Sequence, residues 1–112
     1  MQFVKDGDVY KVARMTGSQD NILGISFSEH EVNVDVVEWD VKQGAIVKSS
    51  SSQVLEQVLS GLKLVNDDLG KKYHLSKIFF LPSDNASNSV YEFLLQELVK
   101  RYDSKLCFKQ LD

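Results

Sequence analysis

Residues 22–41 read ILGISFSEHEVNVDVVEWDV and hold the two clearest strand patterns in the chain. The first half alternates large apolar side chains with small ones, which predicts a half-buried strand over residues 22–27. The second half carries another alternating pattern over residues 32–41, and a short polar turn separates the two. Two such strands joined by a turn favour a sheet with one face on a hydrophobic core.

The second pattern changes phase near its middle. Its apolar residues occupy even positions as far as Val36 and odd positions from Val37 to Val41. Side chains of a strand alternate between faces, so a regular strand cannot bury both sets on one side. An extra residue at a β-bulge near Val36–Val37 would bring both sets inside, and a sheet covered on both faces is the alternative. With the bulge, these polar residues would share the exposed face: Asn33, Asp35, Glu38 and Asp40.

Charge around this stretch is one-sided. The segment Met15–Asp40 contains six carboxylates and no Lys or Arg, whereas the net charge of the 112-residue chain is only −3. A row of carboxylates on a strand complements a cationic protein surface, and a partly exposed Trp would anchor such an interface. An ordinary solvated hairpin face is the alternative. We therefore predict a partner-binding surface made of Glu29, Glu31, Asp35, Glu38, Trp39 and Asp40.

Turn signals predict further strands on either side of this segment. Asp6-Gly7 predicts a hairpin between extended runs at the N-terminus, because Gly tolerates the positive φ of a tight turn. Residues 16–21 read as a loop, and residues 45–48 as a short strand.

A helix with a wide apolar stripe follows the serine run at residues 49–52. Ser50 and Gln53 fit a capping box at its start, and Gly70 fits its end. A helix-interior Gly costs about 1 kcal/mol relative to Ala. Gly61 therefore indicates close packing of this helix against the sheet.

The C-terminal third predicts two strands and a second helix. Within a predicted strand at residues 75–81, residues 78–81 are apolar on both parities, which favours a strand well inside the sheet. Ser89 and Glu92 fit a second capping box, and residues 106–108 predict a last strand. The predicted fold is a single α+β domain over residues 1–112. Its antiparallel-led mixed sheet is a β-meander followed by α-β-α-β, with both amphipathic helices on one face or one on each.

Composition limits the function classes. The chain lacks an apolar run of the ~20 residues that span a bilayer, and its N-terminus has no signal-peptide pattern. Its only cysteine, Cys107, lies in an apolar run, so we expect a buried thiol in a cytoplasmic protein. Basic pairs fall at predicted helix ends, where they oppose the helix dipole, so we expect no nucleic-acid or membrane partner.

Residue types that carry chemistry are sparse. His30, His74 and Cys107 are the only His and Cys side chains, and neighbours in an extended segment such as residues 29–31 point apart. The serines are explained by helix capping, so no nucleophile with a His base emerges. We expect no metal, no cofactor and no catalytic residues, and hence a protein that is not an enzyme.

Two enzyme families resemble parts of the chain. Residues 46–91 resemble the cofactor-binding half of GNAT acetyltransferases, with Asp84-Asn85-Ala86 and Tyr91 as the matching residues. This resemblance implies a minimal or degenerate acetyl-CoA-binding protein whose pocket is lined by Ser49–Ser52 and Asn85. The turn before the first helix has no glycine, however, and a backbone that approaches phosphate usually needs one.

The order β-β-β-α-β-α also resembles the ribonuclease H fold, whose first strand supplies an Asp to catalytic metal ions. The corresponding residues 23–27 contain no Asp, although Glu56 and Asp84 match later ligands. The resemblance therefore implies the topology without the chemistry.

In its size, acidity, lack of catalytic groups and α+β pattern, the whole chain resembles bacterial toxin immunity proteins, including those of contact-dependent growth inhibition systems. The resemblance implies a one-to-one complex that neutralises a cognate basic toxin domain, such as a nuclease. A structural subunit that buries its edge strand in a homodimer is the remaining alternative.

Overall fold

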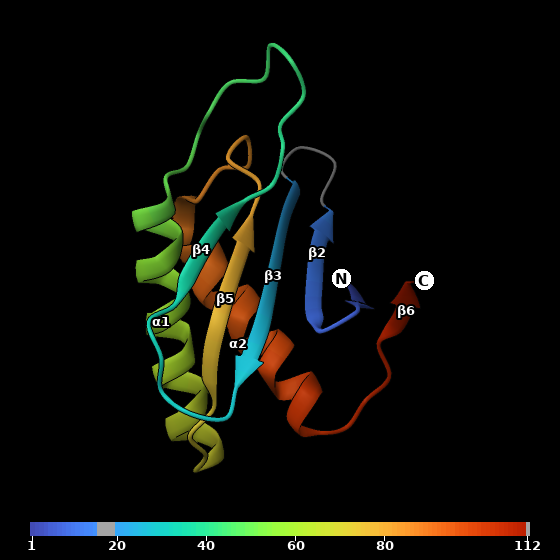
Figure 1. Ribbon diagram of the computed structural model, residues 1–112, viewed down its shortest axis with the longest axis vertical. Helices are drawn as coiled ribbons and strands as arrows, with labels where there is room; N and C mark the ends of the chain where they lie inside the picture. The colour runs from blue at the N-terminus through green and yellow to red at the C-terminus, as the bar shows by residue number, and fades with distance from the viewer. Residues whose placement is uncertain (16–19, 112) are drawn as a thin grey trace.

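The computed structural model describes residues 1–15 and 20–111. Its strands form one mixed sheet and both helices pack on the same face of it, so the fold is α+β as predicted (Figure 1). The strands are β1 (Gln2–Asp6), β2 (Val9–Met15), β3 (Asp20–Ser28), β4 (Asp35–Glu38), β5 (His74–Phe80) and β6 (Lys109–Leu111). The helices are α1 (Ser51–Leu69) and α2 (Val90–Asp103), the latter preceded by a 3-10 turn over Ser87–Ser89.

The sheet runs in the order β4-β5-β3-β2-β1-β6. Its centre is antiparallel, from β1 through β2 and β3 to β5, whereas β4 joins β5 and β6 joins β1 in parallel. The hairpin between β1 and β2 turns at Gly7, whose φ is 62°, so the predicted Asp6-Gly7 hairpin is confirmed. The predicted loop at residues 16–21 lies mostly outside the described residues, and Asp20 and Asn21 already belong to β3.

The bulge predicted at Val36–Val37 is wrong. Strand β4 pairs with β5 without a register shift, so Val37 points to the face opposite Val36. The irregularity lies instead between β3 and β5, where the pairing of Ser26 with Lys77 is followed by that of Phe27 with Leu75. The change of phase in the sequence has a different cause, because this sheet carries apolar side chains on both faces.

Helix α1 begins and ends where its sequence signals predict. Ser50 accepts a hydrogen bond from the Gln53 backbone N–H and Gln53 bonds back to the Ser50 N–H, so the capping box is confirmed. Gly70 ends the helix with a φ of 65°. Gly61 lies in close packing, but against the backbone of Glu92 in α2 and not against the sheet.

Other local predictions fail where tertiary contacts decide. Ser89 makes no side-chain cap, and α2 begins instead after Asn88 and Ser89, both of which have positive φ. Residues 45–48 form no strand, and the last strand lies at residues 109–111 and not at 106–108. Cys107 is exposed, which corrects the expected buried thiol.

The core lies between the sheet and the two helices. Figure 1 shows α2 crossing behind the central strands and α1 standing beside it, near β4 and β5. The fully buried large side chains come from both layers and include Leu23, Ile25, Ile78, Phe80, Tyr91, Leu94, Leu95 and Leu98. Among the described residues, neither helix is long and apolar enough to cross a bilayer.

Candidate partner-binding surface

Strand β4 is an edge of the sheet, and the predicted acidic residues lie on it and on the segments that connect to it. Glu29 and Glu31 occupy the connection that precedes β4, Asp35 and Glu38 are its first and last residues, and Asp40 follows it. All five carboxylates are exposed, and none forms a salt bridge within the described part of the chain. The edge therefore carries negative charge that no neighbouring cation of the fold neutralises by a direct contact.

The prediction that these acids share one face is wrong. Because β4 is regular, Asp35 lies on the face opposite the helices, whereas Glu38 lies on the face that the helices cover. Asp35 also has Lys77 as its neighbour across the strand pair. The acids of β4 therefore lie on opposite faces and do not form a flat row on one face.

Trp39 is half-buried on the face of the sheet that no helix covers. Its ring stacks on Phe79 with a centroid distance of 5.8 Å and an angle of 17° between the ring planes. The Lys11 ammonium lies 5.4 Å from the Trp39 ring centroid. The close approach needs Gly24, since a Cβ at that position would lie 3.0 Å from the Trp39 ring.

A transverse row of residues continues this face across the sheet. Strand pairing aligns Val37 with Phe79, Phe79 with Gly24, Gly24 with Lys11 and Lys11 with Val4. Trp39 therefore covers the middle of a row that is mainly apolar. The sequence analysis named a sheet covered on both faces only as the alternative to a bulge, and it favoured the bulge, so it did not place Trp39 on a second apolar face.

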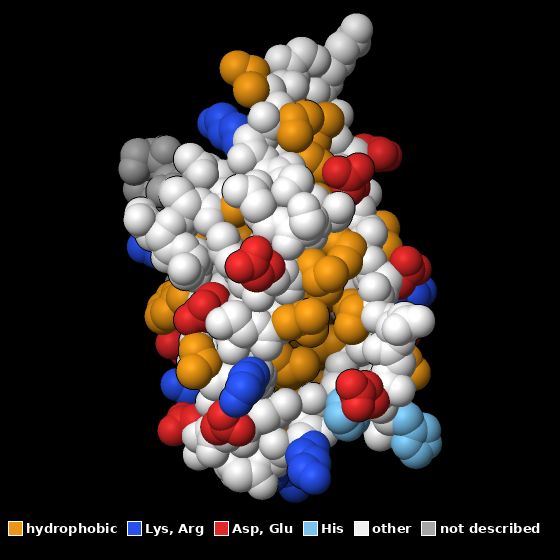
Figure 2. Space-filling model, turned by 90° about the vertical axis from the view of Figure 1, so that its left-hand side faces the viewer, with side chains coloured by type: hydrophobic (Ala, Val, Ile, Leu, Met, Phe, Trp, Pro, Cys, Tyr) orange, Lys and Arg blue, Asp and Glu red, His pale blue; other side chains and the backbone are white. Residues whose placement is uncertain are grey.

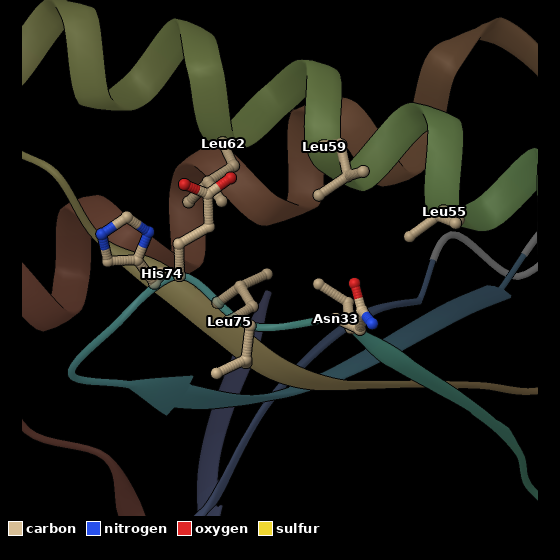
Figure 3. Close-up of a pocket in the computed structure, with 9 residues that line it drawn as sticks. Asn33, Leu55, Leu59, Leu62, His74 and Leu75 are labelled. Carbon is tan, nitrogen blue, oxygen red and sulfur yellow. The ribbon is translucent and has the colours of Figure 1, made fainter.

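An apolar groove runs along the other side of the β4 edge, between α1 and residues 31–34. Residues 31–34 precede β4 and belong to no strand. The groove that they line has a volume of about 410 Å³. Figure 2 shows an apolar band on this side of the molecule, with acidic side chains on both flanks. Figure 3 shows side chains of α1 projecting toward Leu75 and Asn33: Leu55, Leu59 and Leu62.

Two aliphatic residues of the groove have side chains that are unusually exposed to solvent. Leu59 is 41% exposed and Val32 is 46% exposed, although both are aliphatic. The polar side chains that line the groove are those of Glu31, Asn33 and His74. In the sequence, the groove is indicated only by the spacing of the leucines in α1. The same spacing occurs in any helix that packs on a core, so it does not identify a groove.

A buried polar cluster lies near the start of both helices. The resemblance to acetyltransferases implied an acetyl-CoA pocket at this place. The Ser49 hydroxyl is buried and donates to the Pro82 carbonyl, while the Ser50 hydroxyl caps α1. The Asn85 carbonyl accepts a hydrogen bond from the buried Asn21 side chain. These contacts are internal to the fold, and they give the serine run a structural role.

Two titratable groups in this cluster are shifted. Burial raises the pKa of Asp84, and the hydrogen bond that its carboxylate accepts from the Ile22 N–H acts in the opposite direction. Burial raises the pKa of Tyr91 to about 12. The Tyr91 hydroxyl has no partner in good hydrogen-bond geometry among the described residues, although Asn21 and Ser49 lie near enough to oppose the rise in its pKa.

The residues considered for metal or nucleophilic chemistry are dispersed. His30 is exposed after β3, His74 begins β5, and Cys107 is exposed near the C-terminus. Glu56 is exposed on α1 and Asp84 is half-buried after β5. Over residues 1–15 and 20–111, no three His, Cys, Asp or Glu side chains are grouped as metal ligands would be.

Comparison of the chain with protein-family models, with curated proteins and with solved structures finds no match.

Proposed function

We propose that the chain is a non-enzymatic binding protein that neutralises a cationic protein partner, as a toxin immunity protein of the bacterial cytoplasm does. The observation that carries the proposal is the set of five exposed carboxylates on β4 and on the segments directly before and after it, none of them in a salt bridge with a described residue. Such a field accelerates encounter with a basic surface and supplies charged partners once the complex forms.

Apolar surface next to the acids supports an interface and not only a solvated edge. Protein interfaces combine an apolar centre that contains aromatic anchors with a charged and polar rim. Around β4, Trp39 and Phe79 lie on one side and the leucine groove of α1 on the other. A partner that wraps the edge would reach both apolar regions and place its cations against the carboxylates.

The same charges argue against a homodimer through β4. A two-fold interface brings identical patches together. Asp35 and Glu38 of one copy would then approach the same carboxylates of the other, and like charges at close range are unfavourable. A basic partner of a different sequence removes this repulsion, which is why we favour a heterologous complex.

The test is charge reversal at the edge, measured by surface plasmon resonance with a basic toxin domain encoded beside the protein. In Asp35→Lys/Glu38→Lys, we expect the association rate constant at low salt to fall by about tenfold or more. The control is Asp8→Lys/Asp68→Lys, which changes the net charge equally at two exposed sites away from β4. Growth rescue from the toxin should fail in the edge variant and survive in the control.

Equal association rate constants for the two double variants would refute the proposal, because the change in rate would then depend on net charge and not on the position of the charges. A toxin domain that binds the wild-type protein and the edge variant with the same affinity would do so as well.

A further inference from the structure

A second pocket lies where α2 ends before it has covered the sheet, and it contains none of the acidic residues on and beside β4. Helix α2 stops at Asp103, and Figure 1 shows the chain then swinging away from the helix end toward β6. Lys5 of β1 and Tyr10 of β2 are paired neighbours next to this end. They line a pocket of about 430 Å³ together with Tyr73, Tyr102, Lys105 and Phe108, and we call it the tyrosine pocket.

Aromatic rings that hold one another in place form the walls of the tyrosine pocket. Tyr10 meets Tyr102 edge to face with a centroid distance of 5.1 Å, and it meets Phe108 in the same way at 5.1 Å. Tyr73 meets Tyr102 at 5.8 Å and 82°. All four rings are half-buried, so part of each remains accessible. Fixed aromatic walls offer stacking or edge contacts to a planar ring at little cost in conformational entropy.

Cations surround these rings. The Lys5 ammonium lies 5.3 Å from the Tyr10 centroid and the Lys71 ammonium 5.9 Å from the Tyr73 centroid. The one carboxylate that lines the pocket, Asp103, already bonds to Lys71 at 2.6 Å and accepts from the Tyr73 hydroxyl at 2.6 Å. Lys5 and Lys105 have no salt bridge with any described residue. The pocket therefore holds an excess of positive charge in a chain whose net charge is −3.

Lys105 has a backbone conformation that its residue type does not favour. Its φ is 57°, in the left-handed region that Gly or Asn usually fills after a helix. A Lys side chain at such a position costs about 1 kcal/mol or more relative to Gly. The helix dipole does not require this lysine, because the last turn of α2 already contains Lys100 and Arg101. A strained residue at the rim of a pocket fits a role in binding better than a role in folding.

We propose that the tyrosine pocket binds a small planar aromatic anion, meaning an aromatic ring that carries a phosphate or carboxylate group. The ring lies against the tyrosines, and Lys5 and Lys105 bind the anionic group. The volume falls within the range of about 300–1,000 Å³ that small-molecule sites usually have. This inference is independent of the proposed partner, since none of the acidic residues on and beside β4 lines the pocket.

The test uses isothermal titration calorimetry with four probes: phenyl phosphate, adenosine 5′-monophosphate, adenosine and inorganic phosphate. We expect saturable binding of at least one of the two aromatic anions, with a dissociation constant of about 1 mM or lower. Adenosine and inorganic phosphate should each bind at least about tenfold more weakly than that anion, because each lacks half of the recognised chemistry. Failure of both aromatic anions to bind, or equal binding of inorganic phosphate, would overturn the proposal.

Variants locate the binding. Lys105→Gly should relieve the backbone strain, so its melting temperature should rise while affinity for the aromatic anion falls about tenfold or more. Lys5→Met should weaken binding with the fold retained, and Lys109→Met, whose exposed side chain does not line the pocket, should bind as the wild type does. If Lys105→Gly and Lys5→Met are both folded and bind the probe unchanged, the pocket is not the site and the inference is wrong.

Discussion

Replacement of Gly61 by Ala tests the closest contact between the two helices. Gly61 is buried in α1, and a Cβ added there would lie 2.5 Å from the carbonyl oxygen of Glu92 in α2. That oxygen also accepts a hydrogen bond from the Gln96 side chain at 3.2 Å. It belongs to a helical backbone, so it cannot rotate away as a side chain could. The helices must therefore move apart or the backbone must deform.

The magnitude follows from two opposing effects. Ala usually stabilises a helix interior by about 1 kcal/mol relative to Gly. An acceptable carbon–oxygen contact of about 3.3 Å would need a displacement of about 0.8 Å, and a gap of that size forfeits a quarter to a half of the contact energy of nearby atoms. Overpacking of a tight core costs about 1–3 kcal/mol. We expect a net loss of up to about 2 kcal/mol and a melting temperature lower by up to roughly 8 °C.

The assay is urea denaturation followed by circular dichroism, with thermal melting as a second measurement. Glu56→Ala and Glu56→Gly provide the control, because Glu56 is an exposed position in the interior of the same helix. There Ala should exceed Gly in stability by about 1 kcal/mol. If Gly61→Ala stabilises the protein by the amount that the Glu56 pair gives, the close packing of α1 on α2 at this point is refuted.

Three further predictions concern other contacts. Gly24→Ala would place a Cβ 3.0 Å from the Trp39 ring and 3.2 Å from the Phe79 Cβ. The ring should be displaced into solvent, so the fluorescence of this single Trp should shift to longer wavelength, and an unchanged spectrum would contradict the stacking. Tyr91→Phe removes a buried hydroxyl that has no described partner in good hydrogen-bond geometry, so the free energy of unfolding should stay the same or rise by up to about 1 kcal/mol. A clear fall would show that the hydroxyl is bonded to Asn21 or Ser49. Hydrogen bonds from Lys71, and to a smaller extent from Tyr73, lower the pKa of Asp103 below its ordinary value of 3.8. The ionised carboxylate therefore contributes its full stability above the ordinary value, which applies to the unfolded chain, and this contribution is lost as pH falls through the lowered pKa of the folded protein. The stability difference between wild type and Asp103→Asn should therefore be constant near neutral pH and shrink below about pH 4, whereas a difference that grows in acid would give the wrong sign.

Local signals in the sequence were sufficient where the chemistry is local. The hairpin at Gly7 and the helix end at Gly70 both need positive φ, and a glycine specifies this without distant contacts. The Ser50–Gln53 box caps α1 within a single turn. Ser89 shows the limit of this reasoning, because the 3-10 turn before α2 places it at a φ of 53°, where its side chain makes no cap.

The candidate sites could be predicted only in part. Unopposed acids were visible in the sequence, and those on and beside the edge strand β4 form no salt bridge with a described residue. Their division between two faces was not, because it depends on the regular pairing of β4 with β5. The tyrosine pocket gave no signal at all, since Lys5 and Lys105 are 100 positions apart in the sequence and meet only where α2 stops short of the sheet.

The sequence by itself determined the fold class, the start and end of α1 and the excess of acid before residue 41. Each depends on periodicity, capping or composition, which act over a few residues. Only the tertiary structure decided which face each strand residue occupies and what covers it. Because strand side chains alternate, the sequence predicts that Val36 and Val37 point to opposite faces of the sheet. It does not predict that the helices cover one face and the Trp39 ring part of the other. That choice depends on packing between segments far apart in the chain, and neither segment encodes it alone.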